Sequence, residues 1–342
     1  MKNLIKRLSD MRGVSGFEYM ITDELKSILS PYCDEVYTDA LGSVIAVRKC
    51  GAENAPKIMI EAHCDEIGLM VTSVTDEGFL TFANIGGVDN RILPSLEVVV
   101  HGKRDVRGII GIKPPQLRED GKTVKIRDMA IDTGLDANEV KELISVGDPV
   151  TIAQSVGMLG KKQWSGKSLD DRASAAALIT VMKNLCGAEI NADIYTVLAV
   201  QEEVGCRGAK TASYGIAPNM AIAVDVTHAV TPDNSENAFE AGCGAVIAVG
   251  PNLHRKLTQR LFDTAEKYGI KTETEAEGGD TGTDAWEIQT AKNGIPTALI
   301  SIPLKYMHTA VETLMLSDVE AVSELITLFI KHIEEDISWI LL

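Results

Sequence analysis

Two histidines and three carboxylates stand at, or next to, the ends of apolar segments that lie far apart in the sequence. They are His63, Asp170, Glu203, Asp225 and His308. Nitrogen and oxygen ligands without thiolate suit zinc, cobalt or manganese. One catalytic zinc keeps about three protein ligands, whereas two ions about 3.5 to 4 Å apart can share five ligands if one carboxylate bridges them. Taken singly, each residue is as well or better explained as a cap, turn or surface residue, so the joint pattern carries the prediction of a two-ion centre.

The segment AHCDEIGLMV, residues 62–71, places a histidine and an aspartate two positions apart within an apolar run. Side chains of a strand alternate between its two faces, so His63 and Asp65 point to one face and Cys64 and Glu66 to the other. The Asp65 carboxylate can then bind one ring nitrogen of His63 and leave the other nitrogen free for a metal. The alternative is a histidine that is satisfied by its own aspartate at the end of a strand.

Two pairs of adjacent acidic residues lie next to predicted secondary structure, one before a helix and one at the end of a strand. Asp170 and Asp171 in GKSLDDRASAAALI precede a helix of small residues, where one aspartate could be an N-cap worth about 1 kcal/mol and the other has no capping role. Glu202 and Glu203 end the apolar strand of LAVQEEVGCRGA, and ligands of open α/β sheets gather at the carboxyl ends of strands. One glutamate could bind a metal while the other turns toward a substrate. The alternatives are a helix cap for the first pair and solvated loop residues for the second.

A glycine-rich segment, EAEGGDTGTDAWEI, contains Gly282, Thr283 and Asp284. It lacks the spacing and the lysine of a phosphate-binding loop, which argues against nucleotide binding. Two interpretations remain open and are compatible with each other. The segment is a turn followed by Thr283 as the N-cap of a helix, or it is a loop that lines a substrate pocket.

The order of the elements predicts an α/β protein with an insertion. From about residue 166 strands and helices alternate, as in a sheet that is covered by helices on both faces. Between residues 70 and 164 short strands such as GFLTFANI and LEVVVHG are broken by Gly, Pro and Asp turns, which indicates a small β-rich domain. We therefore expect a mixed-sheet catalytic domain made of residues 1–69 and 165–342, with an inserted β-rich domain at 70–164.

Composition and charge exclude several classes of partner. The chain of 342 residues has 33 basic and 49 acidic residues, and its net charge of −16 would repel nucleic acid and anionic membranes. Its first residues lack the apolar core of a secretory signal, and no apolar run reaches the roughly 18 residues of a membrane span. The six cysteines never fall in a C-x-x-C spacing, so neither a zinc knot nor a disulfide framework is expected. We expect a cytoplasmic protein.

Six motifs, in order, resemble those of the M42 metallo-aminopeptidases, the family that includes tetrahedral and glutamyl aminopeptidases. They are AHCDEIG, GKSLDDRA, QEEVGCRGA, VDVTH, GTDA and YMHTAVE. The resemblance extends from about Met11 to the C-terminal helix. It implies a dinuclear enzyme that removes N-terminal residues from short peptides, with zinc or cobalt, or else manganese, as the ions.

Carried over residue by residue, the resemblance implies one ion held by His63, Asp170 and Asp225 and a second held by Asp170, Glu203 and His308. Asp65 would orient His63, and Glu202 would be the general base. Gly282, Thr283 and Asp284 would belong to the substrate pocket. The insert would be a barrel-like dimerisation domain, and dimers would assemble into a dodecamer.

Two positions depart from the family pattern, and three other functions compete with the aminopeptidase. Cys64 replaces an apolar residue and should face away from the ions, while Gln116 in GIIGIKPPQL replaces a histidine.

The nearest rival to the aminopeptidase function is a metal-dependent deacylase of N-acylated amino acids or peptides. An endoglucanase needs a carboxylate pair without metals, which ranks it lower. A non-catalytic assembly protein ranks lower too, because all five ligands and Glu202 are present.

Overall fold

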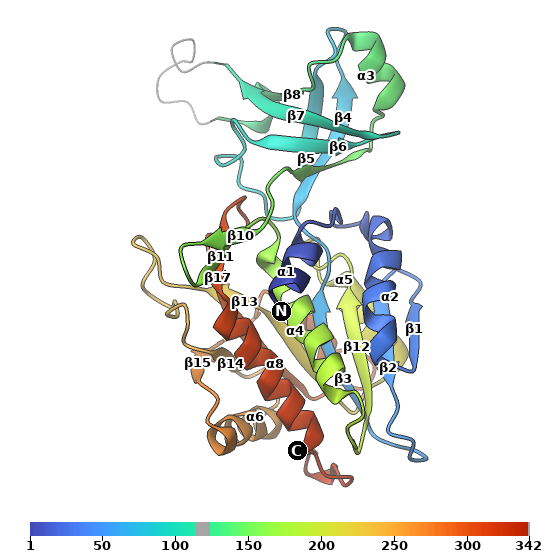
Figure 1. The fold of residues 1–342 in the computed structure, drawn as a ribbon, viewed down its shortest axis with the longest axis vertical. Coiled ribbons are helices and arrows are strands. Elements are labelled where there is room, and N and C mark those ends of the chain that lie inside the picture. Colours follow the sequence, from blue (N-terminus) through green and yellow to red (C-terminus); the bar gives the residue numbers. More distant parts are fainter. Residues whose placement is uncertain (114–123, 341–342) are drawn as a thin grey trace.

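A computed structural model of the protein describes residues 1–113 and 124–340. Its larger part is a sheet covered by helices on both faces, and a small closed barrel stands at one end of this layer structure (Figure 1). The predicted fold class, a mixed α/β sheet with a separate β-rich barrel, is confirmed. No helix within the described residues is long and apolar enough to cross a membrane.

Four parallel strands form the centre of the 11-stranded sheet, in the order β12, β3, β13 and β16. Their sequences are nearly continuous apolar runs, as expected for strands that are buried on both faces. These strands are β3 (Lys57–His63), β12 (Asp193–Ala199), β13 (Met220–His228) and β16 (Thr297–Lys305).

The remaining strands extend the sheet on both sides of this parallel centre, and most of them pair antiparallel. On one side β2 (Val44–Arg48) pairs with β12, and β1 (Glu35–Thr38) forms the edge. On the other side β16 pairs with two strands, so the sheet divides there into two short branches. One branch contains β14 (Ala245–Val249) and β15 (Thr272–Ala276), and the other contains β17 (Glu312–Met315), β11 (Gln163–Gly166) and β10 (Gly157–Leu159).

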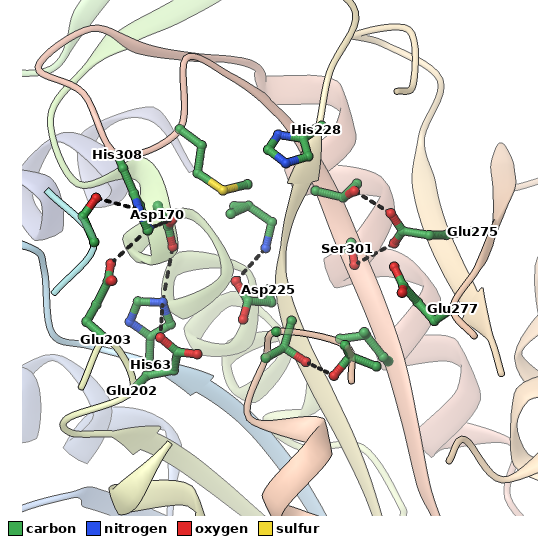
Figure 2. A pocket seen from close by; sticks show the side chains of 18 residues that line it. His63, Asp170, Glu202, Glu203, Asp225, His228, Glu275, Glu277, Ser301 and His308 are labelled. Atoms are coloured by element: carbon green, nitrogen blue, oxygen red, sulfur yellow. Dashed lines mark hydrogen bonds and ion pairs between the residues drawn. The ribbon is translucent and has the colours of Figure 1, made fainter. Parts of the chain in front are cut away.

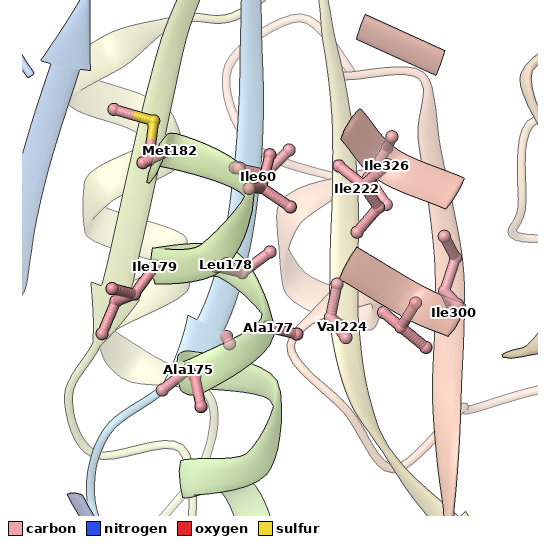
Figure 3. Packing of buried hydrophobic residues seen from close by; sticks show 14 of the residues in the cluster. Ile60, Ala175, Ala177, Leu178, Ile179, Met182, Ile222, Val224, Ile300 and Ile326 are labelled. Carbon is pink, nitrogen blue, oxygen red and sulfur yellow. The ribbon is translucent and has the colours of Figure 1, made fainter. Parts of the chain in front are cut away.

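Helix α4 (Leu169–Leu185) lies against the middle of the sheet because its small side chains permit a close approach. In Figure 3 Ala177 lies beside Val224 of β13, and Leu178 lies beside Ile60 of β3. Four further helices share this face, and two cover the opposite face. The first set is α1 (Lys2–Ser9), α2 (Thr22–Leu29), α6 (Arg255–Tyr268) and α8 (Leu316–Lys331), and the second is α5 (Arg207–Ile216) and α7 (Ala285–Ile288).

The barrel closes in the strand order β4, β5, β8, β7, β6 and β9. Its residues alternate between the interior and solvent; on β7, for example, Val106 and Ile110 are buried while Ile109 is exposed. A short helix, α3 (Ala137–Leu143), packs beside it. The strands are β4 (Gly68–Val74), β5 (Leu80–Ile85), β6 (Glu97–His101), β7 (Asp105–Ile112), β8 (Met129–Asp132) and β9 (Pro149–Ile152). The exact domain boundaries, at 69/70 and 164/165, stay a prediction.

Candidate metal centre

The residues predicted from the sequence come together at the carboxyl edge of the parallel strands, where ligands of such sheets gather (Figure 2). His63 is the last residue of β3, and Asp225 lies near the end of β13. Glu203 follows β12 in a turn, and His308 follows β16. Asp170 enters from the start of α4. All five residues line one pocket of about 460 Å³.

Asp170 lies between the two histidines. Its Oδ1 is 3.1 Å from His63 Nε2 and its Oδ2 is 3.3 Å from His308 Nε2, so each oxygen faces a different imidazole. Glu203 Oε1 lies 3.4 Å from the same His308 nitrogen. Although burial favours the neutral carboxyl, hydrogen bonds with His308 and His63 hold the pKa of Asp170 well below its usual range. The Asp170 carboxylate therefore connects the two imidazoles, one through each of its oxygens.

Asp225 completes the group on the side of β13. Ligand atoms of His63, Asp171 and Asp225 lie within 4.8 Å of one another, as do those of His63, Asp170 and Glu203. The Val226 backbone N–H donates to Asp225 Oδ1 at 2.7 Å, which fixes this carboxylate. Burial raises the pKa of Asp225 well above its usual range, and the neighbouring Asp170 adds to this.

Neither aspartate at the start of α4 acts as a helix cap. Ser168 occupies the N-cap position without a side-chain bond, and Asp170 and Asp171 have non-helical backbone angles. The first amides of the helix are satisfied from elsewhere: the N–H groups of Leu169 and Asp170 donate to Glu312 Oε2 at 2.7 and 3.1 Å. The alternative interpretation of this pair as a cap is therefore wrong.

Asp65 connects His63 with the two glutamates. Its Oδ1 lies 3.5 Å from His63 Nδ1, on the side of the ring away from Asp170, so the expected pairing is present. The two carboxylate oxygens also accept the backbone N–H groups of Glu202 and Glu203, at 3.1 and 3.2 Å. Asp65 is completely buried. One side chain thus fixes both an imidazole and the turn that carries the acidic pair.

Glu202 lies beside the cluster with its carboxylate directed into the pocket. Its Oε2 is 3.9 Å from His63 Nε2, and its Oε1 accepts the thiol of Cys206 at 3.5 Å. Burial raises the pKa of Glu202 to about 8, against the opposing effect of His63. Only 11% of the Glu202 side chain and 4% of the Glu203 side chain are exposed, so the alternative of solvated loop glutamates is wrong.

Glu312 is a buried residue of this site that sequence reasoning missed. Besides the two amides at the start of α4, it accepts the backbone N–H of His308 through Oε1 at 2.9 Å. Burial and the Asp170 carboxylate raise the pKa of Glu312, and the N–H groups act in the opposite direction. One side chain therefore positions both the central aspartate and a histidine. The available signal was its place in the motif YMHTAVE, four residues after His308.

The glycine-rich segment contributes to the pocket only in part. Gly282 and Thr283 line it, and Thr283 Oγ1 lies 2.9 Å from Thr281 Oγ1. Asp284 is buried behind the wall, where its ligand atom groups with those of Glu202 and Cys206. The N-cap of α7 is Asp284, without a capping side-chain bond, and not Thr283 as one interpretation expected.

The two departures from the family pattern have different outcomes. Cys64 is buried outside the pocket lining, with its thiol 3.6 Å from the Leu198 carbonyl, so it faces away from the ligand cluster as expected. Gln116 lies outside the described residues. All six cysteines are free, as the absence of a C-x-x-C spacing predicted.

The donor set fits divalent metal ions. It consists of imidazole nitrogens and carboxylate oxygens in two overlapping groups with ligand atoms within 4.8 Å. Four carboxylates of the pocket, those of Asp170, Glu202, Glu203 and Asp225, are largely buried within this small volume. Burying several like charges is unfavourable unless cations compensate for them, and divalent ions supply that compensation.

An imidazole and carboxylate cluster at the carboxyl edge of a mixed α/β sheet is the kind of site that metal-dependent hydrolases use. The chain belongs to the M42 glutamyl aminopeptidase family, which it matches over residues 42–325. It is 38% identical over 326 residues to a lysyl aminopeptidase from Pyrococcus furiosus, covering 93% of each chain. It therefore belongs to the aminopeptidases, hydrolases that act on peptide bonds.

Two solved structures share this fold over nearly the whole chain. An aminopeptidase from the archaeon Desulfurococcus kamchatkensis superimposes with a TM-score of 0.91 at 36% identity, covering 99% of this chain and 96% of that one. The TET1 peptidase of Pyrococcus horikoshii, described as assembling into a tetrahedron or a large octahedral shell, has a TM-score of 0.86 at 32% identity. The match covers 97% of this chain and 99% of that chain.

Proposed function

We propose that the chain is a dinuclear aminopeptidase that removes N-terminal residues from short peptides. The observation that carries the proposal is the position of Asp170, whose two oxygens face His63 Nε2 at 3.1 Å and His308 Nε2 at 3.3 Å. A carboxylate with one oxygen toward each of two imidazoles is suited to bridge a pair of ions. His63, Asp170 and Asp225 would hold one ion, and Asp170, Glu203 and His308 the other.

Glu202 is the general base of this proposal. Divalent ions held by these residues would supply Lewis-acid activation of a carbonyl and of a water molecule. Glu202 takes the proton of that water and passes it to the leaving amine. The Glu202 carboxylate lies beside His63 but not between His63 and His308, so it can remain free to accept a proton. Asp65 acts through other groups, by orienting His63 and by fixing the amides of the acidic turn.

Hydrolysis of aminoacyl p-nitroanilides tests the proposal. Protein stripped with a chelator is given zinc, cobalt or manganese and tested on free-amine compounds, their N-acetylated forms and carboxymethylcellulose. Metal-dependent cleavage confined to free amines is the expected result, and titration of the ions to saturation should give two per chain. Preference for the acetylated compounds would indicate a deacylase instead, cleavage of the polysaccharide a glucanase, and silence on every substrate a non-catalytic assembly protein.

The barrel provides the basis for a proposed homo-oligomer. The TET1 peptidase assembles into closed shells, and this chain shares its fold over 97% of its length. Ile109 on the outer surface of the barrel is 52% exposed, and Val146 is 66% exposed. We propose that these surfaces contribute to dimers and that the dimers form a dodecamer. Sedimentation velocity measures the size directly, and a monomer at micromolar concentration would contradict this.

The proposed cellular location follows from the cysteines. All six are free thiols, which is typical of proteins in a reducing compartment. We therefore propose a cytoplasmic location. Fractionation of the producing cell checks this.

A further inference from the structure

Two glutamates occupy the wall of the pocket that lies across from the cluster of His63, Asp170 and Glu203 (Figure 2). Glu275 belongs to β15, and Glu277 follows the end of that strand. Among the described residues that line the pocket there is no lysine or arginine. The far wall is therefore acidic, and the proposed ligand set and general base make no use of it.

Hydrogen bonds hold the Glu275 carboxylate in place within the wall. The Thr227 hydroxyl donates to Oε1, and the Ser301 hydroxyl lies 3.4 Å from Oε2. These partners come from β13 and β16, so three strands of the sheet fix one carboxylate. Burial raises the pKa of Glu275, and repulsion from Glu277 raises it further. A cation that enters between the two carboxylates would relieve this repulsion.

Charge balance leaves these two glutamates without compensation. In the proposed centre two divalent ions would carry four positive charges, and the four carboxylates beside them that line the pocket, those of Asp170, Glu202, Glu203 and Asp225, would carry four negative charges. The two charges of Glu275 and Glu277 remain on the opposite wall. A substrate side chain that reaches this wall is favoured when it is positive and disfavoured when it is negative.

The distance from the centre suits a long side chain. Asp225 and Thr227 lie two residues apart on the same face of β13, which separates them by roughly 6.6 Å along the strand. Thr227 contacts the Glu275 carboxylate directly. A peptide whose terminal amine and first carbonyl are held at the metal centre would extend its first side chain along this stretch. The four-carbon stem of lysine carries its ammonium group across it.

We propose that this enzyme selects peptides with an N-terminal lysine or arginine, and that Glu275 and Glu277 bind the side-chain cation. The inference rests on the proposed aminopeptidase function. Thr227 and Ser301 are positioning residues, because their hydroxyl groups hydrogen-bond to Glu275 and orient its carboxylate. An N-terminal glutamate or aspartate would be rejected, because its carboxylate would face two others.

The critical comparison is between lysyl and norleucyl p-nitroanilide, because norleucine has an unbranched apolar side chain without the ammonium group. The wild-type enzyme with its metals should have a kcat/KM for the lysyl compound at least about tenfold higher, the effect of one hydrogen bond to a charged group. Glu275→Gln and Glu277→Gln should each lower this lysyl-to-norleucyl ratio severalfold, leaving the norleucyl value close to wild type. Glu277→Lys should reverse the preference toward glutamyl p-nitroanilide.

Glu273→Gln is the matched control, because Glu273 lies on the same strand but is exposed and outside the pocket lining. It should leave the ratio unchanged. A second measurement avoids turnover: calorimetry of metal-loaded Glu202→Gln protein with lysinamide and norleucinamide, where lysinamide should bind at least about tenfold more tightly.

The possible results separate the two proposals. Equal hydrolysis of the lysyl and norleucyl compounds by the wild type would overturn the specificity proposal and leave the aminopeptidase intact. If Glu275→Gln and Glu277→Gln lowered kcat/KM for all substrates by the same factor, the pair would bind the terminal amine common to them, and the assignment to a side-chain subsite would be wrong. Absence of metal-dependent cleavage of every free-amine substrate would overturn the aminopeptidase proposal itself.

Discussion

Replacement of Glu312 by glutamine tests whether the backbone around the metal centre, and not only the ligands, determines metal affinity. Glu312 accepts three backbone N–H groups, two at Oε2 and one, from His308, at Oε1. A glutamine has one oxygen and one NH₂ group. The more favourable orientation of the glutamine amide places its oxygen toward the N–H groups of Leu169 and Asp170 and keeps those two bonds. Its NH₂ group then faces the N–H of His308, so the bond to His308 is lost.

The magnitude follows from that single bond. Leaving a buried backbone N–H without its acceptor costs about 1 to 3 kcal/mol, which corresponds to a factor of roughly 5 to 150 in an equilibrium constant. His308 has a φ of 61°, a left-handed conformation that is unfavourable for a non-glycine residue, so its loop should relax when the bond is lost. Movement of His308 would weaken metal binding. We therefore expect Glu312→Gln to lower affinity for the more weakly held ion about 10-fold to 100-fold.

The assay is competition for zinc between the protein and a chromophoric chelator, measured together with thermal unfolding of the metal-free protein. Asp318→Asn is the control, because buried Asp318 accepts the backbone N–H groups of Gly242 and Gly244, at 2.8 and 3.0 Å, away from the pocket. Both variants should lose stability, but only Glu312→Gln should lose metal affinity. Equal metal affinity in Glu312→Gln and wild type would refute this reasoning.

Three further substitutions have separable effects. Glu202→Gln should lower kcat by about 10² to 10⁴ while the metal content measured by mass spectrometry stays at the wild-type value. Gly87→Ala places a Cβ 2.7 Å from Nδ1 of His308 and should lower zinc affinity about tenfold in the same chelator assay, whereas Gly215→Ala, with open space around its Cβ, should not. Burial, reinforced by the Asp65 carboxylate, raises the pKa of Glu18 from 4.5 to about 7. The stabilising contribution of the protonated Glu18 side chain is therefore complete below pH 4.5 and is lost as the pH rises through 7. Glu18→Gln, which can keep both N–H bonds made to Oε1, should stabilise the metal-free protein by about 1 to 3 kcal/mol at pH 8 and not at pH 4 in urea unfolding; an equal gain at both values would contradict this.

The fold and the principal side chains of the site could be predicted because both depend on local patterns. Apolar runs such as MAIAVDV and KIMIEAH locate central strands, and chemically active residues at their ends converge because parallel strands share a carboxyl edge. His63 and Asp65 follow from the period of a strand alone. The prediction needed no knowledge of strand order, since every central strand ends at the same edge.

Features that depend on strand order or on backbone partners were not predictable. The position of β15 beside β14, and hence the exposure of Glu275 and Glu277 to the pocket, depends on pairings that leave no local pattern. Glu312 binds backbone N–H groups, which every residue except proline carries, so its partners have no sequence signature. The aspartates before α4 also follow the statistics of helix caps, although Glu312 takes over that role.

The contact between the barrel and His308 would couple the proposed subunit assembly to the proposed metal binding. The Gly87 carbonyl, just beyond barrel strand β5, lies 3.2 Å from His308 Nδ1, and β4 begins only five residues after His63. A subunit contact that shifts the barrel would therefore change the free energy of placing a ligand at the metal, and occupancy of the metal would change the subunit equilibrium by the same amount. In a cell short of the metal ion, the size distribution of the particle would then report how much of the enzyme is loaded.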